Sequence, residues 1–294
     1  MTYETILVPV DGSDCSLRAA EEARTIAEAY DAAVELLSVV DVRSYGLSTP
    51  EAGMPTAAVE EALVEHAEDA LDDAEAVLEG RSVESEVRHG VPVEAVVEYA
   101  EEVAADLVVM GTHGHTGMER IALGSVAEGV LREAPAPVVT VREDVERERY
   151  DRILVPTDGS EHAEAAFDHA VDVADRFDAD LRVLVVVDPE EIGGWFNAGG
   201  LSEEFVERHE EKARENARRL LGRAEDAGVD AETTVLEGAP HEEIVAYAED
   251  EAVDLIAMGT HGRSGVARVL LGSVTESVVR NAACPVLSVR ARSE

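Results

Sequence analysis

Short apolar runs alternate with longer amphipathic stretches along the whole chain. Apolar runs bounded by turn residues are typical of buried strands, and apolar residues spaced by three and four positions are typical of helices. In the first half we predict strands at Thr5–Val10, Val34–Val40, Ser82–Arg88, Leu107–Met110 and Pro137–Arg142. Between them we predict helices at Ser16–Ala29, Ala57–Leu78, Pro92–Val103 and Ser125–Glu133.

The second half repeats this order, which indicates a duplicated unit. Its predicted strands are Ile153–Thr157, Leu181–Val187, Ala231–Glu237, Asp254–Met258 and Pro285–Arg290. Its predicted helices are Ala163–Arg176, Glu203–Ala227, His241–Glu251 and Ser273–Ala282. Arg43–Pro55 and Pro189–Gly200 are predicted loops.

Regular alternation of strands and helices favours parallel sheets with helices on both faces. We therefore predict an α/β protein with two tandem, doubly wound, Rossmann-like sheets, each of five parallel strands in the order 3-2-1-4-5. The duplication places the first domain at residues 1–142 and the second at residues 150–294. The short, highly charged stretch 143–149 is the predicted linker.

A glycine-rich segment follows the fourth predicted strand of each half. Gly111–Ser125 reads GTHGHTGMERIALGS and Gly259–Ser273 reads GTHGRSGVARVLLGS, so Gly-x-x-Gly is followed by nine residues and then Gly-Ser in both. Glycine lets backbone N–H groups approach an anion without an intervening Cβ, and the amino end of the following helix favours negative charge. We interpret both segments as phosphate-binding loops.

The end of the first strand supplies the second part of the predicted site. Pro-x-Asp-Gly-Ser follows that strand in each half and contains Asp11 and Asp158. In a sheet of this order, ligands bind outside the carboxyl ends of strands 1 and 4, where the winding of the sheet reverses. The aspartates and the glycine loops therefore predict one site per half, with the acid on ribose hydroxyls or the adenine amino group.

The charge pattern separates the glycine loops from the rest of the chain. The chain carries 64 acidic and 24 basic residues, a formal net charge of −40. Leu255–Thr275 contains no acidic residue and includes His261, Arg263 and Arg268. Burial of the strand explains the missing acids but not the added bases. A strongly negative surface repels nucleic acids and anionic membranes, so we expect neither as a partner.

Composition also bears on the environment. Lys212 is the only lysine, and an acidic, lysine-poor surface is similar to that of extreme halophiles. Cys15 and Cys284 occupy non-equivalent places in the repeat, so we expect reduced packing residues. The amino terminus lacks a signal-peptide pattern, and no apolar run is long enough to span a membrane. We therefore expect a cytoplasmic protein that needs concentrated salt.

The Ile-Leu-Val-Pro-x-Asp-Gly-Ser opening, the G-x-x-G-x9-G-[ST] loop and the closing strand together resemble the ATP-binding branch of the universal stress protein family, in tandem over nearly the whole chain. The resemblance implies ATP, with ADP or AMP as alternatives, and Mg²⁺ or Mn²⁺ held through the phosphates. It implies nucleoside contacts at Asp11 and Asp158 and adenine contacts at Val39 and Val186, with Met110 and Met258 nearby. It implies phosphate contacts at Gly111, Gly114, Gly124, Ser125 and Val126 in the first half, and at Gly259, Gly262, Gly272, Ser273 and Val274 in the second.

Structural roles compete with these assignments. Ser125 and Ser273 each stand three positions before a glutamate, which is the pattern of a capping box at a helix start. Asp11 and Asp158 are alternatively caps of the following helix. For the histidine of each glycine loop, we expect a role in bracing the backbone rather than in catalysis.

Three kinds of function remain open. In the first, the nucleotide is a conformational ligand in a stress response. In the second, the protein is a weak ATP hydrolase or an adenylating enzyme of a related fold. The sequence lacks the Gly-x-x-x-x-Gly-Lys-[ST] loop and a lysine placed to neutralise a transferring phosphoryl group, so we expect at most slow hydrolysis. The third, a dimerisation scaffold with vestigial sites, is disfavoured by intact motifs in both halves.

Comparison of the halves predicts two further features. We expect the closing strands, Pro137–Arg142 and Pro285–Arg290, to pair as an internal pseudo-dimer, because an exposed edge invites uncontrolled pairing. Further association into a homo-oligomer stays open. The second loop has Arg263 where the first has His115. We therefore expect tighter binding at the second site at neutral pH, and a selective gain at the first site on acidification.

Overall fold

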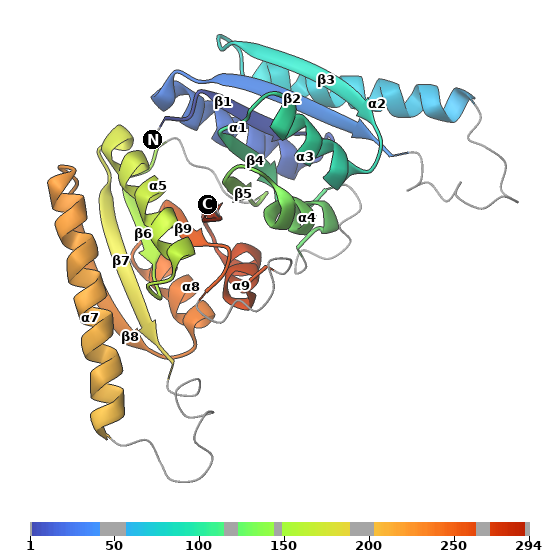
Figure 1. Cartoon of the computed structure of the whole chain (residues 1–294). Helices are drawn as coiled ribbons and strands as arrows, with labels where there is room; N and C mark the ends of the chain where they lie inside the picture. Colours follow the sequence, from blue (N-terminus) through green and yellow to red (C-terminus); the bar gives the residue numbers. More distant parts are fainter. Residues whose placement is uncertain are drawn as a thin grey trace, which may run out of the picture. The chain divides into compact units, whose positions relative to one another are not determined.

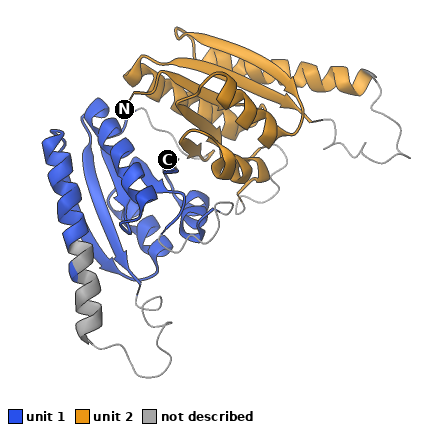
Figure 2. Cartoon of the chain, viewed as in Figure 1, with its two compact units in different colours: residues 1, 149–294 blue, residues 2–148 orange. Residues whose placement is uncertain are grey.

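The computed structural model describes residues 2–41, 57–114, 123–143, 149–188, 203–262 and 271–291. The chain forms two compact units, which we call the first unit (Thr2–Glu148) and the second unit (Arg149–Glu294) (Figure 2). Met1 groups with the second unit by contact clustering, but it lies outside the described residues. Each unit contributes five strands and its own helices (Figure 1).

The first unit is a parallel α/β sheet in the order β3-β2-β1-β4-β5. Its strands are β1 (Thr5–Pro9), β2 (Ala33–Val40), β3 (Val83–His89), β4 (Leu107–Gly111) and β5 (Val138–Val141). Its helices are α1 (Asp14–Tyr30), α2 (Ala57–Val77), α3 (Pro92–Glu102) and α4 (Ser125–Glu133). Helix α1 packs beside α2, and α3 packs beside α4 on the opposite face of the sheet (Figure 1).

The second unit repeats the same topology, with the parallel order β8-β7-β6-β9-β10. Its strands are β6 (Arg152–Pro156), β7 (Asp180–Val187), β8 (Ala231–Glu237), β9 (Leu255–Gly259) and β10 (Val286–Val289). Its helices are α5 (Glu161–Phe177), α7 (Glu203–Asp226), α8 (Pro240–Asp250) and α9 (Ser273–Asn281). The predicted fold class and the strand order 3-2-1-4-5 are confirmed.

The starts of the first helix of each unit differ from the prediction by two residues. Helix α1 begins at Asp14 because Ser13 is its N-cap and accepts a hydrogen bond from the N–H of Ser16. Helix α5 begins at Glu161 because Ser160 caps it in the same way. An acidic residue in the first turn is favourable against the helix dipole, so these starts fit the local chemistry.

The core lies where the central strands are covered on both faces. Ile6 and Leu7 of β1 and Ile153 and Leu154 of β6 have no exposed surface. Full burial of such side chains stabilises a fold by about 1.5–3 kcal/mol each, so these strands anchor the loops at their carboxyl ends.

A half-buried aspartate links β1 to β4 in the first unit and β6 to β9 in the second. Asp106 Oδ2, just before β4, accepts hydrogen bonds from the N–H groups of Glu4 and Thr5 at 2.9 and 3.1 Å. In the second unit Asp254 Oδ2 accepts from Asp151 and Arg152 at 2.9 and 3.0 Å. These carboxylates satisfy strand-end donors and align the two central strands of each sheet.

The remaining sequence-based expectations concern the cysteines, membrane-spanning helices, the loops and the linker. Cys15 and Cys284 are buried and form no disulfide. None of the helices in the described residues is long and apolar enough to cross a membrane. The predicted loops at 43–55 and 189–200 and most of the predicted linker lie outside the described residues. Pairing of the two closing strands concerns the relative placement of the units and stays a prediction.

Candidate functional site

The acid that follows the first strand of each unit faces the glycine loop. In the first unit, Asp11 Oδ1 accepts hydrogen bonds from the N–H and the hydroxyl of Ser13 at 3.1 and 2.6 Å. Its other oxygen, Oδ2, lies so close to Gly114 that a Cβ there would stand 2.2 Å from it. The serine, and not the aspartate, caps the helix, so the capping alternative for Asp11 is wrong.

The second unit builds the same corner from Asp158 and Gly262. Asp158 Oδ1 accepts from the N–H of Ser160 at 2.9 Å, and Ser160 caps α5. A Cβ at Gly262 would stand 2.9 Å from Asp158 Oδ2. Both aspartates are exposed at the end of their strand. Each unit therefore places an acidic acceptor beside the second glycine of its loop.

The third glycine of each loop opens the following helix. Gly124 and Gly272 are the N-caps of α4 and α9, and no side chain makes a cap hydrogen bond in either helix. Ser125 and Ser273 are the first helical residues and are exposed, so the capping-box alternative is wrong. The reason is that both helices begin one residue earlier than a capping serine requires, so that a glycine takes the N-cap position.

This geometry leaves donors for an anion at the start of α4 and α9. The first N–H groups of a helix have no intrahelical acceptor, and no side chain caps them here. The N–H groups of Gly124 and Gly272 are already used, because each donates to a threonine carbonyl, Thr112 or Thr260, at 2.9 Å. The glycines therefore contribute space, and the uncapped N–H groups at the helix start belong to the following residues, among them Val126 in the first unit.

The first glycine of each loop has a packing role. A Cβ at Gly111 would lie 2.9 Å from Cys15 Sγ and 3.0 Å from its carbonyl carbon. A Cβ at Gly259 would lie 2.7 Å from the carbonyl carbon of His162. Glycine at these places lets the first helix of each unit approach the fourth strand. Their predicted phosphate contacts stay untested.

The predicted adenine contacts divide into two pairs. Val39 in β2 and Val186 in β7 are half-buried, whereas the residues on either side of them are buried. Met110 and Met258 are only 4 and 5 % exposed and pack into the core. The valines thus offer apolar surface in β2 and β7, whereas the methionine side chains belong to the buried core.

The loop histidines are braced by threonine side chains. His113 Nδ1 lies 2.9 Å from Thr112 Oγ1, and His261 Nδ1 lies 3.0 Å from Thr260 Oγ1. Within the described part of the chain, the Nε2 atoms of both histidines are buried without a hydrogen-bond partner. Threonine, rather than the backbone, holds each ring. His115 and Arg263 lie outside the described residues, so their predicted roles stay untested.

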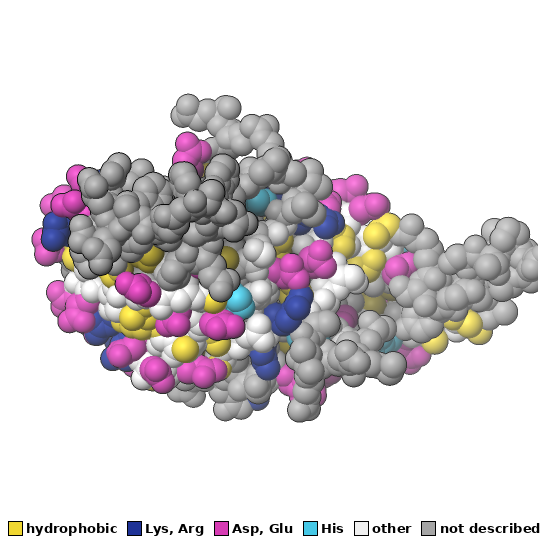
Figure 3. Space-filling view, turned by 90° about the horizontal axis from the view of Figure 1, so that it is seen from below, with side chains coloured by type: hydrophobic (Ala, Val, Ile, Leu, Met, Phe, Trp, Pro, Cys, Tyr) yellow, Lys and Arg dark blue, Asp and Glu magenta, His cyan; other side chains and the backbone are white. Residues whose placement is uncertain are grey.

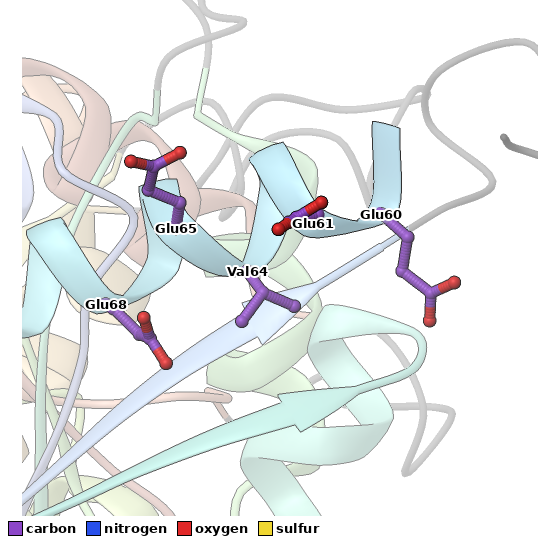
Figure 4. A pocket seen from close by; sticks show the side chains of 5 residues that line it. All are labelled: Glu60, Glu61, Val64, Glu65 and Glu68. Atoms are coloured by element: carbon purple, nitrogen blue, oxygen red, sulfur yellow. The ribbon is translucent and has the colours of Figure 1, made fainter. Parts of the chain in front are cut away.

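A pocket elsewhere does not suit a phosphate. It is lined by one face of α2, where Glu60, Glu61, Glu65 and Glu68 surround Val64 (Figure 4). Like charges repel an anion, and the lining includes no basic residue. Acidic side chains are also spread over the described surface seen in Figure 3. No group of three or more His, Cys, Asp and Glu able to hold a metal occurs among the described residues.

The chain is similar to known proteins along its whole length. The universal stress protein family profile matches residues 2–142 and 149–290. A universal stress protein of Mycolicibacterium smegmatis is 31% identical over 300 residues, covering 98% of this chain and 97% of that protein. One of Methanocaldococcus jannaschii is 43% identical over 141 residues, covering 48% of this chain and 82% of that protein. The crystal structure of an Archaeoglobus fulgidus universal stress protein covers 99% of this chain and 100% of its own, with a TM-score of 0.76 and 23% identity.

Proposed function

Because the chain belongs to the universal stress protein family, we propose that each unit binds one adenine nucleotide, foremost ATP, as a conformational ligand. One observation carries this proposal. In both units, the carboxylate after the first strand approaches the second glycine of the loop, Asp11 beside Gly114 and Asp158 beside Gly262. A nucleoside acceptor and a phosphate loop therefore share one edge of each sheet, where ligands of doubly wound sheets bind.

Different residues of the proposed site suit different parts of the nucleotide. Carboxylate oxygens accept hydrogen bonds, so Asp11 and Asp158 suit ribose hydroxyls or the adenine amino group. The half-buried Val39 and Val186 offer apolar contact for a base. The uncapped first turns of α4 and α9 suit phosphate oxygens. A divalent cation, Mg²⁺ or Mn²⁺, would be held through those phosphates and would supply charge neutralisation when bound.

We favour binding without turnover over the alternative of ATP hydrolysis. Phosphoryl transfer needs positive charge at the transferring group and a residue that orients the attacking water. The strand-1 carboxylates are engaged with Ser13 and Ser160, and the chain's single lysine, Lys212, falls within α7. The role in a stress response rests on family membership alone.

Two measurements test this proposal. Purified protein is denatured and the released nucleotide is identified by chromatography, and we expect an adenine nucleotide. Titration with MgATP should then show binding that Asp11→Asn with Asp158→Asn weakens, because an amide is a poorer acceptor than a carboxylate. Release of ADP from added ATP at several turnovers per minute would favour the hydrolase instead. Absence of any nucleotide binding would contradict the proposal.

A further inference from the structure

The two units differ at one position beneath the glycine loop. The residue two places after the N-cap serine is Cys15 in the first unit and His162 in the second. Both lie directly against the first glycine of their loop. A Cβ at Gly111 would stand 2.9 Å from Cys15 Sγ, and a Cβ at Gly259 would stand 2.7 Å from His162 Cβ. The second site therefore has an imidazole where the first has a thiol.

A backbone hydrogen bond holds His162 neutral. The N–H of Ala291, just after β10, donates to His162 Nδ1 at 2.9 Å. An Nδ1 that accepts cannot carry a proton, so the neutral ring carries its proton on Nε2. Protonation would break this bond. In the first unit the Cys15 thiol instead donates to the carbonyl of Val141 at 3.2 Å.

A second imidazole stands beside the first. The ring centroids of His162 and His261 are 5.2 Å apart, so the helix start and the glycine loop each contribute one ring. His261 Nδ1 is paired with the Thr260 hydroxyl, and its Nε2 is buried without a partner among the described residues. Two imidazolium ions at this separation would repel each other, and a nearby anion would reduce that repulsion.

The charges around the pair are mixed. The pKa of His162 is lowered from its ordinary value, first by burial and then by the nearby His261 and Arg290. Glu161 on α5 and Asp158 after β6 act in the opposite direction. Without a ligand, His162 thus resists protonation, which agrees with the hydrogen bond from Ala291.

Resting on the function proposed above, we propose that His162 and His261 are phosphate-binding residues of the second site, and that this pair takes up a proton from solvent when the nucleotide's phosphates lie beside Gly259 and the amino end of α9. A polyphosphate beside the rings offsets the repulsion from His261 and Arg290 and favours the imidazolium. Binding at the second site then tightens as pH falls, which differs from the gain selective for the first site that His115 alone predicts. The first unit cannot respond in this way at Cys15.

The duplication supplies matched variants for the test. Gly124→Val leaves the second site alone and Gly272→Val leaves the first alone. His162→Cys gives the second unit the residue that the first unit holds, and Cys15→His makes the reverse change. ATP's own terminal phosphate titrates in the same pH range, but it does so equally with and without each swap. Any contribution of His115 also cancels within each pair.

The primary experiment follows the imidazole resonances of His162 and His261 by NMR between pH 5 and 8, with and without MgATP, in Gly124→Val protein at the salt concentration that keeps it folded. We expect MgATP to raise the pKa of at least one ring by about one unit, which equals a tenfold change in affinity across the transition. Calorimetry in two buffers of different ionisation enthalpy should show proton uptake. His162→Cys should abolish most of this uptake, and Cys15→His should introduce it at the first site.

The outcomes separate this inference from the proposed function. If MgATP binds the second site while both histidine pKa values stay unchanged, and His162→Cys keeps the pH dependence, the inference is overturned and nucleotide binding stands. If no nucleotide binds at any pH, both fail. Should His162→Cys not fold, the resonances of His162 in otherwise intact protein decide the question.

Discussion

Replacing Gly114 with alanine should weaken nucleotide binding at the first site without unfolding the protein. The new Cβ would stand 2.2 Å from Asp11 Oδ2, whereas ordinary contact begins at 3.4 Å, so the oxygen must move by the difference of 1.2 Å. Asp11 is exposed, so its side chain can rotate away without unfolding the protein, although this strains its hydrogen bonds with Ser13. Gly262→Ala requires less, because 3.4 minus 2.9 leaves 0.5 Å for Asp158 Oδ2.

The expected loss of affinity follows from the hydrogen bond that we propose between this carboxylate and the nucleoside. A hydrogen bond to a charged group contributes about 1.5–3 kcal/mol, so its loss weakens binding by about 10- to 150-fold. We expect a loss in this range for Gly114→Ala. A shift of about half an ångström lengthens a hydrogen bond without removing it, so Gly262→Ala should weaken its site less than about tenfold.

Isothermal titration with MgATP measures both effects. Gly114→Ala is studied together with Gly272→Val and Gly262→Ala together with Gly124→Val, so that each protein keeps one site. The control is Gly222→Ala in α7, where a Cβ meets no atom within 4 Å. Alanine there should raise stability by up to about 1 kcal/mol and leave affinity unchanged. Equal affinities for Gly114→Ala and its parent would refute the placement of Asp11 on the nucleoside.

Four further predictions concern stability and assembly. Asp106→Ala should lower the free energy of unfolding by about 1–3 kcal/mol, because two strand-end N–H groups lose their acceptor, whereas Asp106→Asn should lose less; equal denaturation midpoints would contradict this. Transfer to about 0.05 M salt should expand or unfold the chain, since the net charge of −40 is then poorly screened; unchanged circular dichroism and melting temperature would argue against it. The pKa of His162 is lowered in the folded protein, so below about pH 6.5 the unfolded chain binds more protons than the folded chain. Acidification below that pH should therefore lower the free energy of unfolding more in the wild type than in His162→Cys, whereas acidification down to that pH should affect both proteins equally. The closing strands of the two halves should pair, and a crystal structure with β5 and β10 far apart would exclude the pseudo-dimer.

The fold could be predicted because each strand and helix carries its own periodic pattern, and the duplication gives that pattern twice. The helix starts are harder to predict from the sequence, because Ser13 and Ser125 are equally suitable N-cap residues by type. Ser13 caps α1 because Asp11 receives its N–H and hydroxyl, whereas Gly124 takes the cap position of α4. This choice depends on the preceding loop, and a four-residue pattern does not contain it.

The candidate site could be predicted in outline but not in the division of roles. The aspartates and loops were found from their positions at strand ends. The packing role of Gly111 depends on how closely α1 approaches β4, which is a tertiary distance. The exchange of Cys15 for His162 is visible in the aligned halves, but its partners Ala291 and His261 lie far along the chain. The repeated acid at Asp106 and Asp254 was a signal that sequence reasoning could have used.

The central claim is that each chain holds two adenine nucleotide sites, one per unit. Titration of nucleotide-free protein with MgATP in concentrated salt tests it most directly. The account predicts two equivalents of ATP per chain, one after either Gly124→Val or Gly272→Val, and none after both. A wild-type stoichiometry of one or zero, or binding that survives the double change in a protein with an unaltered fold, would contradict it.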